Sequence, residues 1–449
     1  MPDLNPAAAT ARPYVPFTYE QDWYRANIRQ SGGAHKNVRL SYEILGDFDP
    51  DAFTEALRGF VARHDALHLA PLPEGGPEGQ YLRPPRPDEQ TVERQSVTAA
   101  SARQFSHYAA ALLSRDFVTP WSEPDAQRPF TLRLLRHTPR HHALLATFQN
   151  LVFDGRGHAL FAHEIWRDYA TLLAGGTPPA TAPSFADAAL SQRTRYGPGH
   201  LARAARSWRE RLDFAARNPW PGSGGQSSDA GSVHVEFGAE AVAALRRACE
   251  REHCTVPQWL VASFARATAR RTGLARLALW VTMDSRRARE RDLVGMLAGA
   301  SPLALRRADA DAATVRDEVR GQLLEALRHQ QLTAAELLAL SQEFGGAQAL
   351  RRDIYVSLRT IVDDDREVRR ATGPLRVTAD AHPLRRTTLV SPSALHLSCV
   401  EHRDKVVVDL VFDGLRAGRP LAGAIVDAMA ADLASLPSAP PVRPADPPH

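Results

Sequence analysis

Lysine is almost absent from this sequence of 449 residues: the two lysines are Lys36 and Lys405, and arginine supplies nearly all of the positive charge. The arginines are scattered through amphipathic segments and form no basic tract with interleaved aromatic residues, which a nucleic-acid-binding surface would require. The formal net charge of +4 is also modest. We therefore expect no nucleic acid among the partners of this chain.

Cysteines and long apolar runs are scarce as well. The three cysteines are an odd number without the spacing of a disulfide framework or a metal site, so we expect reduced thiols and no bound metal. No segment is long and apolar enough to cross a bilayer, and the opening "MPDLNPAAATARPYV" lacks the apolar core of a secretion signal. The sequence predicts a cytoplasmic protein without a membrane partner.

The composition and the residue pattern indicate an α/β protein with more than one domain. Hydrophobic residues make up 44% of the chain and charged residues 24%, and the length exceeds what one hydrophobic core usually holds. Helical and strand-like segments mix without strict alternation, which fits two layered α/β sandwiches of similar size. The Gly/Pro-rich stretch "GGTPPATAPS" is the predicted linker. We place one domain at 1–180, a second at 181–436, and a disordered Pro-rich tail at 437–449.

One segment combines a buried strand, a polar pair and a turn. "HHALLATFQNLVF" is typical of a mostly buried strand, and "HALFAHEIWRDYATLLAGG" after it is typical of an amphipathic helix. Gln149 and Asn150 lie near the end of the strand, and Asp154 and Gly155 lie at the turn before the helix. Side chains at such a strand-to-helix connection often carry function, so these four residues are our first candidates for a site.

Several segments occur in the order and spacing of one known family. "VPFTYEQDWY" carries Thr18 and Gln21, "LRGFVARHDALH" follows as a helix, and "QRPFTLRLLR" precedes the central strand. "RDLVGMLAGASPLAL" lies far downstream and contains Gly299. Over nearly its whole length the chain thereby resembles the condensation domains of nonribosomal peptide synthetases, in the superfamily of chloramphenicol acetyltransferase. It departs from that family at Glu20, where the opening Ser-x-Ala-Gln motif has alanine, and at Gly299, where the family has asparagine.

The resemblance implies two chloramphenicol-acetyltransferase-like halves that form a V-shaped pseudo-dimer around an interface tunnel. It also implies that two carrier proteins present substrates on phosphopantetheine arms from opposite mouths, and that an amine or hydroxyl acceptor attacks a donor thioester. No permanently bound cofactor is expected. Because this sequence carries no adenylation or carrier segment, we expect a monomer that meets acyl or peptidyl carrier proteins in trans.

The central motif of the family is His-His-x-x-x-Asp-Gly, whose second histidine is read as the base or as the group that positions the nucleophile. Here Gln149 and Asn150 replace both histidines, while Asp154 and Gly155 remain. An amide has no useful basicity, so general-base assistance worth ~10²–10⁴ in rate must be lost or replaced. The Asn150 amide can still orient a nucleophile or donate a hydrogen bond to a developing oxyanion. Gln149 also excludes the pattern of heterocyclising relatives, which have aspartate there.

The family reading gives Asp154 a structural role, in which it pairs with an arginine from the second half of the chain. Both Arg286 and Arg287, in "MDSRRARERDLVG", are candidates for that partner. The loss of either member of a buried pair would leave an uncompensated charge and would cost several kcal/mol, roughly 3–5.

Histidines elsewhere in the chain could replace the missing base. His158 lies near the start of the helix after the turn, where the helix N-terminus favours the neutral, basic form of an imidazole. The pair His141-His142 lies at the opposite end of the strand, roughly 20–25 Å from the polar pair at ~3.3 Å per residue, and is not assigned a catalytic role. We expect His163 and His396 to be structural.

Three functions remain open on the sequence. The first is an acyltransferase that joins a carrier-bound acyl group to an amine or alcohol, with Asn150 as an orienting group. The second is a catalytically silent module that docks a carrier protein or recruits another enzyme. The third is different chemistry, such as cyclisation or elimination, on a carrier-bound intermediate. The retained apolar strand and the Asp154-Gly155 turn favour the first.

Overall fold

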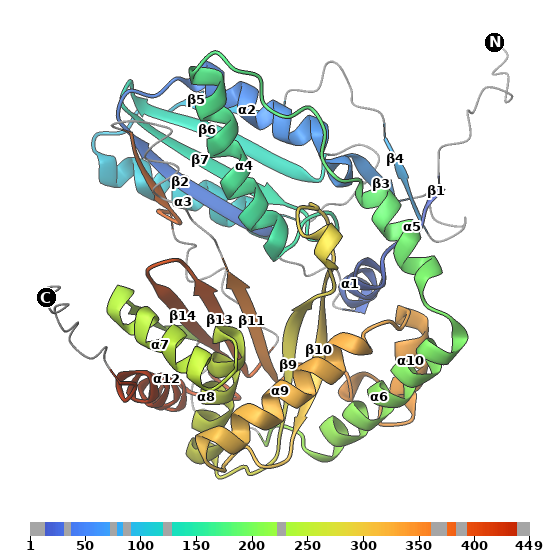
Figure 1. Cartoon of the computed structure of the whole chain (residues 1–449). Helices are drawn as coiled ribbons and strands as arrows, with labels where there is room; N and C mark the ends of the chain where they lie inside the picture. Colours follow the sequence, from blue (N-terminus) through green and yellow to red (C-terminus); the bar gives the residue numbers. More distant parts are fainter. Residues whose placement is uncertain are drawn as a thin grey trace, which may run out of the picture.

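The computed structural model describes residues 14–30, 37–71, 79–83, 91–119, 128–221, 230–360, 375–382 and 393–437, so the tail predicted at 437–449 lies almost wholly outside the described residues. Within these ranges a five-stranded sheet and a six-stranded sheet each carry their own helices (Figure 1). A third, small sheet has the order β1-β4-β3. The fold is therefore mixed α/β with two separate main sheets.

The first main sheet has the strand order β12-β2-β7-β6-β5. Its central strand β7 is buried along all eight residues, because helices cover both of its faces. Helices α2 and α4 pack on one face around the larger hydrophobic cluster, and α3 packs on the other. The elements up to α5 are β1 (Tyr14–Val15), α1 (Tyr19–Gln30), β2 (Val38–Leu45), α2 (Pro50–Arg63), β3 (Leu69–Pro71), β4 (Gln80–Leu82), β5 (Glu93–Ser96), α3 (Ala102–Val118), β6 (Phe130–Thr138), β7 (His141–Phe148), α4 (Gly155–Leu173) and α5 (Phe185–Arg195).

A buried ion-pair network joins α2 to α4. Arg63, at the end of α2, donates from Nε to Glu164 Oε2 at 2.8 Å, and its Nη1 lies 2.6 Å from Asp168 Oδ2. His64 Nε2 lies 3.1 Å from the same Glu164 oxygen. Burial acts to raise the pKa of Glu164, but His64 and Arg63 outweigh it and lower that pKa. The Arg-His pair of "LRGFVARHDALH" therefore stabilises the packing of two helices.

The second main sheet has the order β10-β9-β11-β13-β14-β8, in which β11 runs parallel to β9 and β13 and the other pairs are antiparallel. One face packs against α7, α8, α9 and α12 in the largest hydrophobic cluster. Along β11, Ile354 and Val356 point into that cluster, so the alternate residues face the other way. The elements are α6 (Pro198–Arg217), β8 (Gly231–Phe237), α7 (Ala239–Arg251), α8 (Val256–Thr272), β9 (Leu277–Asp284), β10 (Ala298–Leu305), α9 (Ala312–Arg328), α10 (Ala334–Gln342), β11 (Ile354–Thr360), β12 (Arg376–Ala379), β13 (Leu395–Glu401), β14 (Val406–Phe412) and α12 (Arg419–Ala434), with short 3₁₀ helices at Asp65–His68, Ala288–Glu290 and Gly346–Gln348.

Strand β12 follows β11 in the sequence but belongs to the first sheet, where it pairs antiparallel with β2. A hydrogen bond from Asp380 N to Ser41 O, at 2.8 Å, extends this pairing beyond the strand. Asp380 has φ = +52°, in the left-handed region that few residues other than glycine adopt. The sequence analysis did not predict this crossing strand. It brings a carboxylate from the second half of the chain to the edge of the first sheet.

The predicted linker connects α4 to α5, and the chain beyond it is held firmly. Asp65 accepts hydrogen bonds from Ser184 Oγ at 2.7 Å and from the backbone N–H of Phe185 at 2.8 Å. The Phe185 ring is fully buried among residues from both parts of the chain. The division of the domains at residue 180 stays a prediction.

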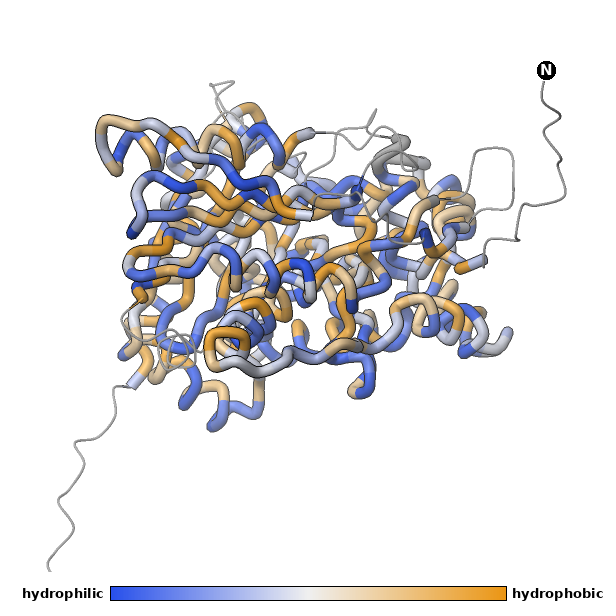
Figure 2. The backbone as a smooth tube through the Cα atoms, turned by 90° about the horizontal axis from the view of Figure 1, so that it is seen from above, coloured by the Kyte–Doolittle hydropathy of each residue, from blue (hydrophilic) through white to orange (hydrophobic). Residues whose placement is uncertain are grey.

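Three further observations bear on the class of protein. None of the helices in the described residues could cross a membrane, and hydrophobic residues are interspersed with hydrophilic ones along the tube in Figure 2. The described histidines, cysteines and carboxylates form no group of three or more that could hold a metal ion. All three cysteines are free thiols.

Candidate active site

The polar pair follows β7 directly and lies in a turn with a fixed backbone. Gln149 N donates to Pro129 O at 2.7 Å, and Val152 N donates back to Gln149 O at 3.1 Å. The carbonyl oxygen of Leu151 accepts a hydrogen bond of 2.8 Å from Gln21 Nε2. The apolar triplet 151–153 is buried, so the strand's end cannot swing freely. These contacts fix the backbone of the turn that carries Asn150.

Thr18 and Gln21, which match the opening motif of the family, hold this turn from α1. Thr18 N donates to Gln21 Oε1 at 3.0 Å, and Gln21 N donates to Thr18 Oγ1 at 3.1 Å, so the two residues cap each other. The Thr18 hydroxyl then donates to Met296 O at 3.0 Å, in the segment before β10. The motif therefore ties the turn to the second sheet.

Asp154 is the N-cap of α4 and the centre of a buried ion pair. Its Oδ1 accepts from the backbone N–H groups of Arg156 and Gly157, both at 3.0 Å, which satisfies two otherwise free donors of the helix. Its Oδ2 accepts from Leu297 N at 2.9 Å. Arg286 donates to both carboxylate oxygens, at 2.7 and 3.1 Å. One side chain thus holds the helix start, the turn and the second half together.

Arg286, and not Arg287, is the partner of Asp154. The Arg286 side chain also donates to Leu293 O at 3.1 Å and to Gly295 O at 2.9 Å, and it is 2% exposed. Burial acts to lower the pKa of Arg286, but Asp154 and Asp284 outweigh it and raise that pKa. The backbone N–H of Arg287 instead donates to Glu290 Oε2 at 2.9 Å, and Arg287 has no contact with the turn among the interactions of the described residues. The choice between the two arginines that the sequence left open is resolved by this geometry.

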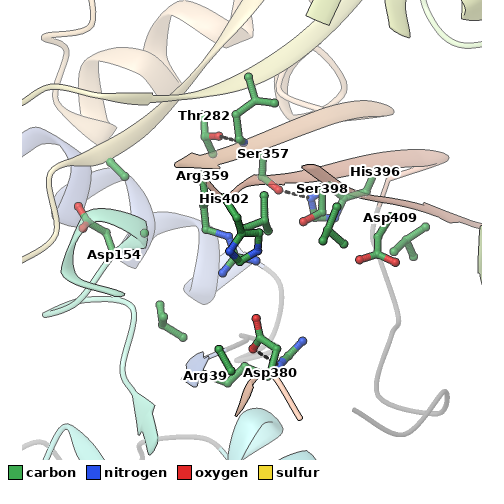
Figure 3. A pocket seen from close by; sticks show the side chains of 18 of the residues that line it. Arg39, Asp154, Thr282, Ser357, Arg359, Asp380, His396, Ser398, His402 and Asp409 are labelled. Atoms are coloured by element: carbon green, nitrogen blue, oxygen red, sulfur yellow. Dashed lines mark hydrogen bonds and ion pairs between the residues drawn. The ribbon is translucent and has the colours of Figure 1, made fainter. Parts of the chain in front are cut away.

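A cavity of about 1670 Å³ is lined by residues from both main sheets. Asn150, Asp154 and Gly155 line it from the end of β7 and the start of α4. The opposite wall comes from β8, β11, β13 and β14, and α1 and β12 close it at the sides. Figure 3 shows Asp154 on one side of this space and the polar side chains of the second sheet on the other. Asn150 therefore faces an interior space where a substrate can bind.

Tyr24 lies beside Asn150 in this cavity, and the sequence analysis missed it. Its hydroxyl oxygen is buried and makes no hydrogen bond of ordinary geometry within the described residues. Burial raises the pKa of Tyr24 far above its usual value, and the nearby Asn150 amide offsets part of the rise. The phenol therefore stays protonated and is available as a donor. Glu20, Tyr24 and Asn27 recur every three or four residues along α1, a spacing that could have indicated one shared face.

Gln149 and His158 lie outside the residues that line the cavity. His158 lies in the first turn of α4 and is buried, and its Nδ1 makes no hydrogen bond in the described part of the chain. Burial, with the nearby Arg359 charge, lowers the pKa of His158 to about 3. So weak a base, which is not among the residues that line the cavity, does not fit the role of a displaced catalytic base. The sequence argument placed His158 correctly near the helix start but could not give the direction of its side chain.

Two departures from the family pattern lie side by side in the cavity wall. Glu20 stands where the family has alanine and Gly299 where it has asparagine, and both line the cavity. A Cβ atom at position 299 would lie 3.2 Å from Gln330 Oε1 and 3.4 Å from Glu20 Cγ, so these two side chains border the space that a side chain at 299 would need. Glu20 Oε2 accepts a hydrogen bond from Gln192 Nε2 at 2.8 Å. Burial raises the pKa of Glu20, although the Gln192 hydrogen bond opposes the rise.

The second sheet presents a polar surface to the cavity. Ser357 Oγ and His396 Nε2 are 3.0 Å apart, and His234 Nδ1 lies 2.8 Å from Asp409 Oδ1. Figure 3 shows Ser357, His396, Ser398 and Asp409 along one face of the sheet. His396, which the sequence analysis took as structural only, therefore lies in the cavity wall. Polar residues at every second position of "YVSLRT" and "LHLSCVE" were the signal that could have revealed this face.

A charged group lies where β2, β11 and β12 meet the cavity. Arg39 Nη1 lies 3.4 Å from Asp380 Oδ1. The aliphatic stem of Arg359 crosses the start of α4, since a Cβ atom at Gly155 would lie 3.3 Å from Arg359 Cγ. In Figure 3, Arg359 and His402 lie between Asp154 and the Arg39–Asp380 pair.

Comparison with known proteins places this geometry in a context. The family model described as Condensation domain matches residues 15–349. One of the linear gramicidin synthase proteins of Brevibacillus parabrevis is 25% identical over 343 residues, which is 72% of this chain and 4% of that protein. Bacitracin synthase 3 of Bacillus licheniformis is 22% identical over 268 residues, which is 58% of this chain and 4% of that protein. The chain spans between 4% and 8% of the length of the curated relatives it matches.

Solved structures share the fold. The first condensation domain of the calcium-dependent antibiotic synthetase, in complex with a substrate analogue, has a TM-score of 0.72 and 21% identity, with 95% of this chain and 98% of that chain covered. The X-domain from teicoplanin biosynthesis, solved as a complex with OxyB, has a TM-score of 0.68 and 20% identity, with 95% of each chain covered. The two sheets and their helices are those of the chloramphenicol-acetyltransferase-like fold.

Proposed function

Because this chain belongs to the condensation-domain family of nonribosomal peptide biosynthesis, we propose that it transfers an acyl or aminoacyl group from a carrier-bound thioester to an amine or hydroxyl acceptor. In this proposal Asn150 stands in the place of the family's histidine and acts by orientation and hydrogen bonding. Acyl or peptidyl carrier proteins are the partners, met in trans by a monomer, and the phosphopantetheine arm is part of the substrate.

The observation that carries this proposal is the position of Asn150. The residue lies in a turn fixed by α1 and β6, it lines a cavity of about 1670 Å³, and the cavity wall opposite is polar. A module that only docks a partner has no need for an interior space of this size with hydroxyl, imidazole and carboxylate groups on its wall. The space therefore supports chemistry on a bound substrate.

Acyl transfer to an amine can balance its protons without a general base from the protein. The neutral amine attacks the thioester carbonyl, the C–N bond forms, the C–S bond breaks, and the proton lost by the nitrogen ends on the departing thiolate, whose pKa as a thiol is ~8.5. An α-amine with a pKa of about 8 is already partly neutral at physiological pH. A general base would add ~10²–10⁴ in rate, which is helpful and not indispensable.

Asn150 and Tyr24 supply the donors that this step requires. The tetrahedral intermediate carries a negative oxygen, and each preorganised donor aimed at it is worth about 10²–10³ in rate. The Asn150 amide donates from Nδ2, and the Tyr24 hydroxyl is buried, protonated and without a hydrogen bond of ordinary geometry in the described residues. Both lie on the same side of the cavity, so one oxyanion can meet both.

Glu20 is the group in the cavity wall best suited to receive the proton of the acceptor. Its carboxylate lies on the same helix as Tyr24, one turn earlier, so the two side chains share a face. Burial raises the pKa of Glu20, which brings it nearer to the working pH and makes it a stronger base than an exposed glutamate. The acceptor would lie between Glu20 and Asn150.

A second candidate function is the recruitment of a partner protein without catalysis. Two observations favour it: neither histidine of the central motif is present, and the X-domain that shares the fold was solved in complex with the enzyme OxyB. In this reading Asp154 and Arg286 preserve the fold, and the cavity has no reaction to perform.

Mass spectrometry of acyl-loaded carrier proteins, incubated with a panel of amines and alcohols with and without the protein, tests the two candidates together. Transfer shows as the mass of the acylated acceptor and the free thiol of the carrier. The acyltransferase proposal predicts product that depends on the protein. Tight carrier or enzyme binding without any product would support recruitment instead, and a loss of water from the loaded carrier would indicate cyclisation or elimination.

A further inference from the structure

The charged group at the junction of β2, β11 and β12 contains an arginine without a counterion. Arg359 makes no ion pair and no hydrogen bond with any described residue, although it is partly buried in the cavity wall. The carboxylate in this group, Asp380, is already paired with Arg39. The carboxylate of this group is therefore engaged by a second guanidinium, and Arg359 has no direct ion-pair partner among the described residues.

The position of Arg359 relative to the central motif is fixed by its stem. Arg359 Cγ and Cδ lie against Gly155, where a Cβ atom would be 3.3 and 3.4 Å away. Gly155 is the first residue of α4, so the positive end of that helix lies next to the guanidinium. Gly155 N makes no hydrogen bond within the described residues, because the Asp154 cap accepts from the next two N–H groups instead. An anion here would meet both a guanidinium fork and a helix N-terminus.

A partly buried arginine without a direct ion-pair partner destabilises the folded protein, and this favours a role for Arg359 in binding an anionic ligand. Burial lowers the pKa of Arg359 and the Arg39 charge acts in the same direction, although the charges of Asp380 and Asp409 oppose them. A buried cation is normally paired, because its desolvation is expensive without a counterion. The same field acts on His158, whose pKa it helps to lower. A ligand that brings a carboxylate would remove this penalty and gain a charge-assisted, bidentate contact.

We propose that Arg359 binds a free carboxylate on the acceptor substrate, so that the acceptor's amine or hydroxyl lies beside Asn150. The inference rests on the proposed function for the position of the acceptor. It names the acceptor class as an amine or alcohol that carries its own carboxylate, such as an amino acid that is not tethered through that group.

The phosphodiester of a phosphopantetheine arm is the other source of a suitable anion. The pantetheine chain separates that phosphate from the thioester, so the phosphate belongs near a mouth of the cavity when the thioester is at the motif. Arg359 instead touches Gly155, five residues from Asn150 along the same turn. This position favours a short acceptor that spans from Arg359 to Asn150.

Calorimetric titration of the full chain tests the proposal without any turnover. The probes are matched pairs, L-leucine with L-leucinamide and L-phenylalanine with L-phenylalaninamide, together with 4′-phosphopantetheine and pantetheine. The variants are Arg359→Gln, Arg359→Lys and Arg376→Gln, the last removing an equal charge from another arginine that lines the cavity. Wild type should bind the acids about 10- to 100-fold more tightly than the amides, as expected for a charged hydrogen-bonded pair. Arg359→Gln should abolish this preference, Arg359→Lys should keep part of it, and Arg376→Gln should keep all of it.

Thermal melting gives a second readout that a merely structural arginine would not produce. Because Arg359 has no partner in the described residues, Arg359→Gln should melt no lower than wild type, and the acids should raise the melting temperature of wild type alone. No preference for acids in wild type, or an equal loss in Arg376→Gln, would overturn the carboxylate site. If Arg359→Gln weakens only 4′-phosphopantetheine, the anion is the phosphodiester. Product formation without any acid preference would refute this inference and leave the proposed function intact.

Discussion

Removal of the Asp154 carboxylate is the most direct perturbation of the frame that holds the site. Asp154→Ala deletes the cap of α4, the hydrogen bond to Leu297 N and both bonds to Arg286. The two members of the ion pair have side-chain exposures of 1% and 2%, so the remaining guanidinium would be a buried charge without its counterion. Such a change belongs to the severe class of core substitutions.

The magnitude follows from these parts. Breaking a buried pair on one side costs about 3–5 kcal/mol, and loss of the cap contributes about 1 kcal/mol, part of which is already included in the first figure. With a fall of roughly 2–4 °C per kcal/mol for large domains, a loss of about 3–5 kcal/mol should lower the melting temperature by about 6–20 °C. A matched control is Asp380→Asn, because asparagine tolerates the left-handed backbone at this position and the Arg39–Asp380 pair, half exposed at its carboxylate, should contribute only about 0–1 kcal/mol.

The assay is thermal unfolding by circular dichroism, repeated with urea to give a midpoint. Asp154→Asn separates the two roles, because asparagine is as good a helix cap as aspartate but carries no charge. The double variant Asp154→Ala/Arg286→Met removes both charges and should recover part of the loss. If Asp154→Ala melts like Asp380→Asn and yet loses all activity, the structural role of Asp154 is refuted and a direct role in the reaction takes its place.

Three further outcomes are expected. Glu20→Gln should reduce transfer and remove the acidic limb of the pH–rate profile, which lies above the usual glutamate range because burial raises the pKa of Glu20. Glu236→Gln, at another carboxylate in the cavity wall, should leave the profile unchanged. An unaltered limb in Glu20→Gln would exclude Glu20 as the base. Gly299→Asn should cost about 1–3 kcal/mol in urea unfolding by overpacking against Gln330 and Glu20, and Glu20→Ala in the same chain should restore part of it. Additive losses would show that positions 20 and 299 do not compete for space. His158 has a pKa of about 3 in the folded protein and ~6.5 in the unfolded chain, so the unfolded chain binds more protons between these two values. The stability that its burial supports is complete well above pH 6.5, and on the order of 2 kcal/mol of it is lost between pH 7 and 5. His158→Gln should flatten this dependence of stability on pH, and an unchanged slope would contradict the burial of the imidazole.

The sequence alone was sufficient to predict the strand-to-helix turn of the site and the motif residues that hold it. Asp154 and Gly155 were predicted at a strand-to-helix turn, and the turn is where the structure has them, because apolar periodicity and helix-capping residues are local signals. The family pattern of Thr18 and Gln21 was also readable, and their hydrogen bonds explain why these residue types hold the turn. The choice between Arg286 and Arg287 needed three dimensions, since adjacent residues after a strand point in opposite directions.

The functional groups that surround the turn in the cavity were not predicted from the sequence. Tyr24, His396 and Arg359 come from a helix and two strands that are far apart in the sequence, and only tertiary packing brings them to one cavity. Strand β12 could not be foreseen, because strand pairing between distant segments leaves no local pattern. His158 shows a further limit: its position near the motif suggested function, but the sequence could not give the burial that lowers the pKa of its imidazole to about 3.

The central claim is that Asn150 still serves a working site by orientation and not by proton abstraction. Single-turnover transfer from a loaded carrier protein, measured for wild type and Asn150→Ala as a function of pH, tests it most directly. We expect Asn150→Ala to form product about 10–10³-fold more slowly, as expected for one lost hydrogen bond in the transition state, and to keep the pH profile of wild type, because the Asn150 amide does not titrate and any acidic limb belongs to Glu20. Transfer by Asn150→Ala at the wild-type rate would contradict the claim.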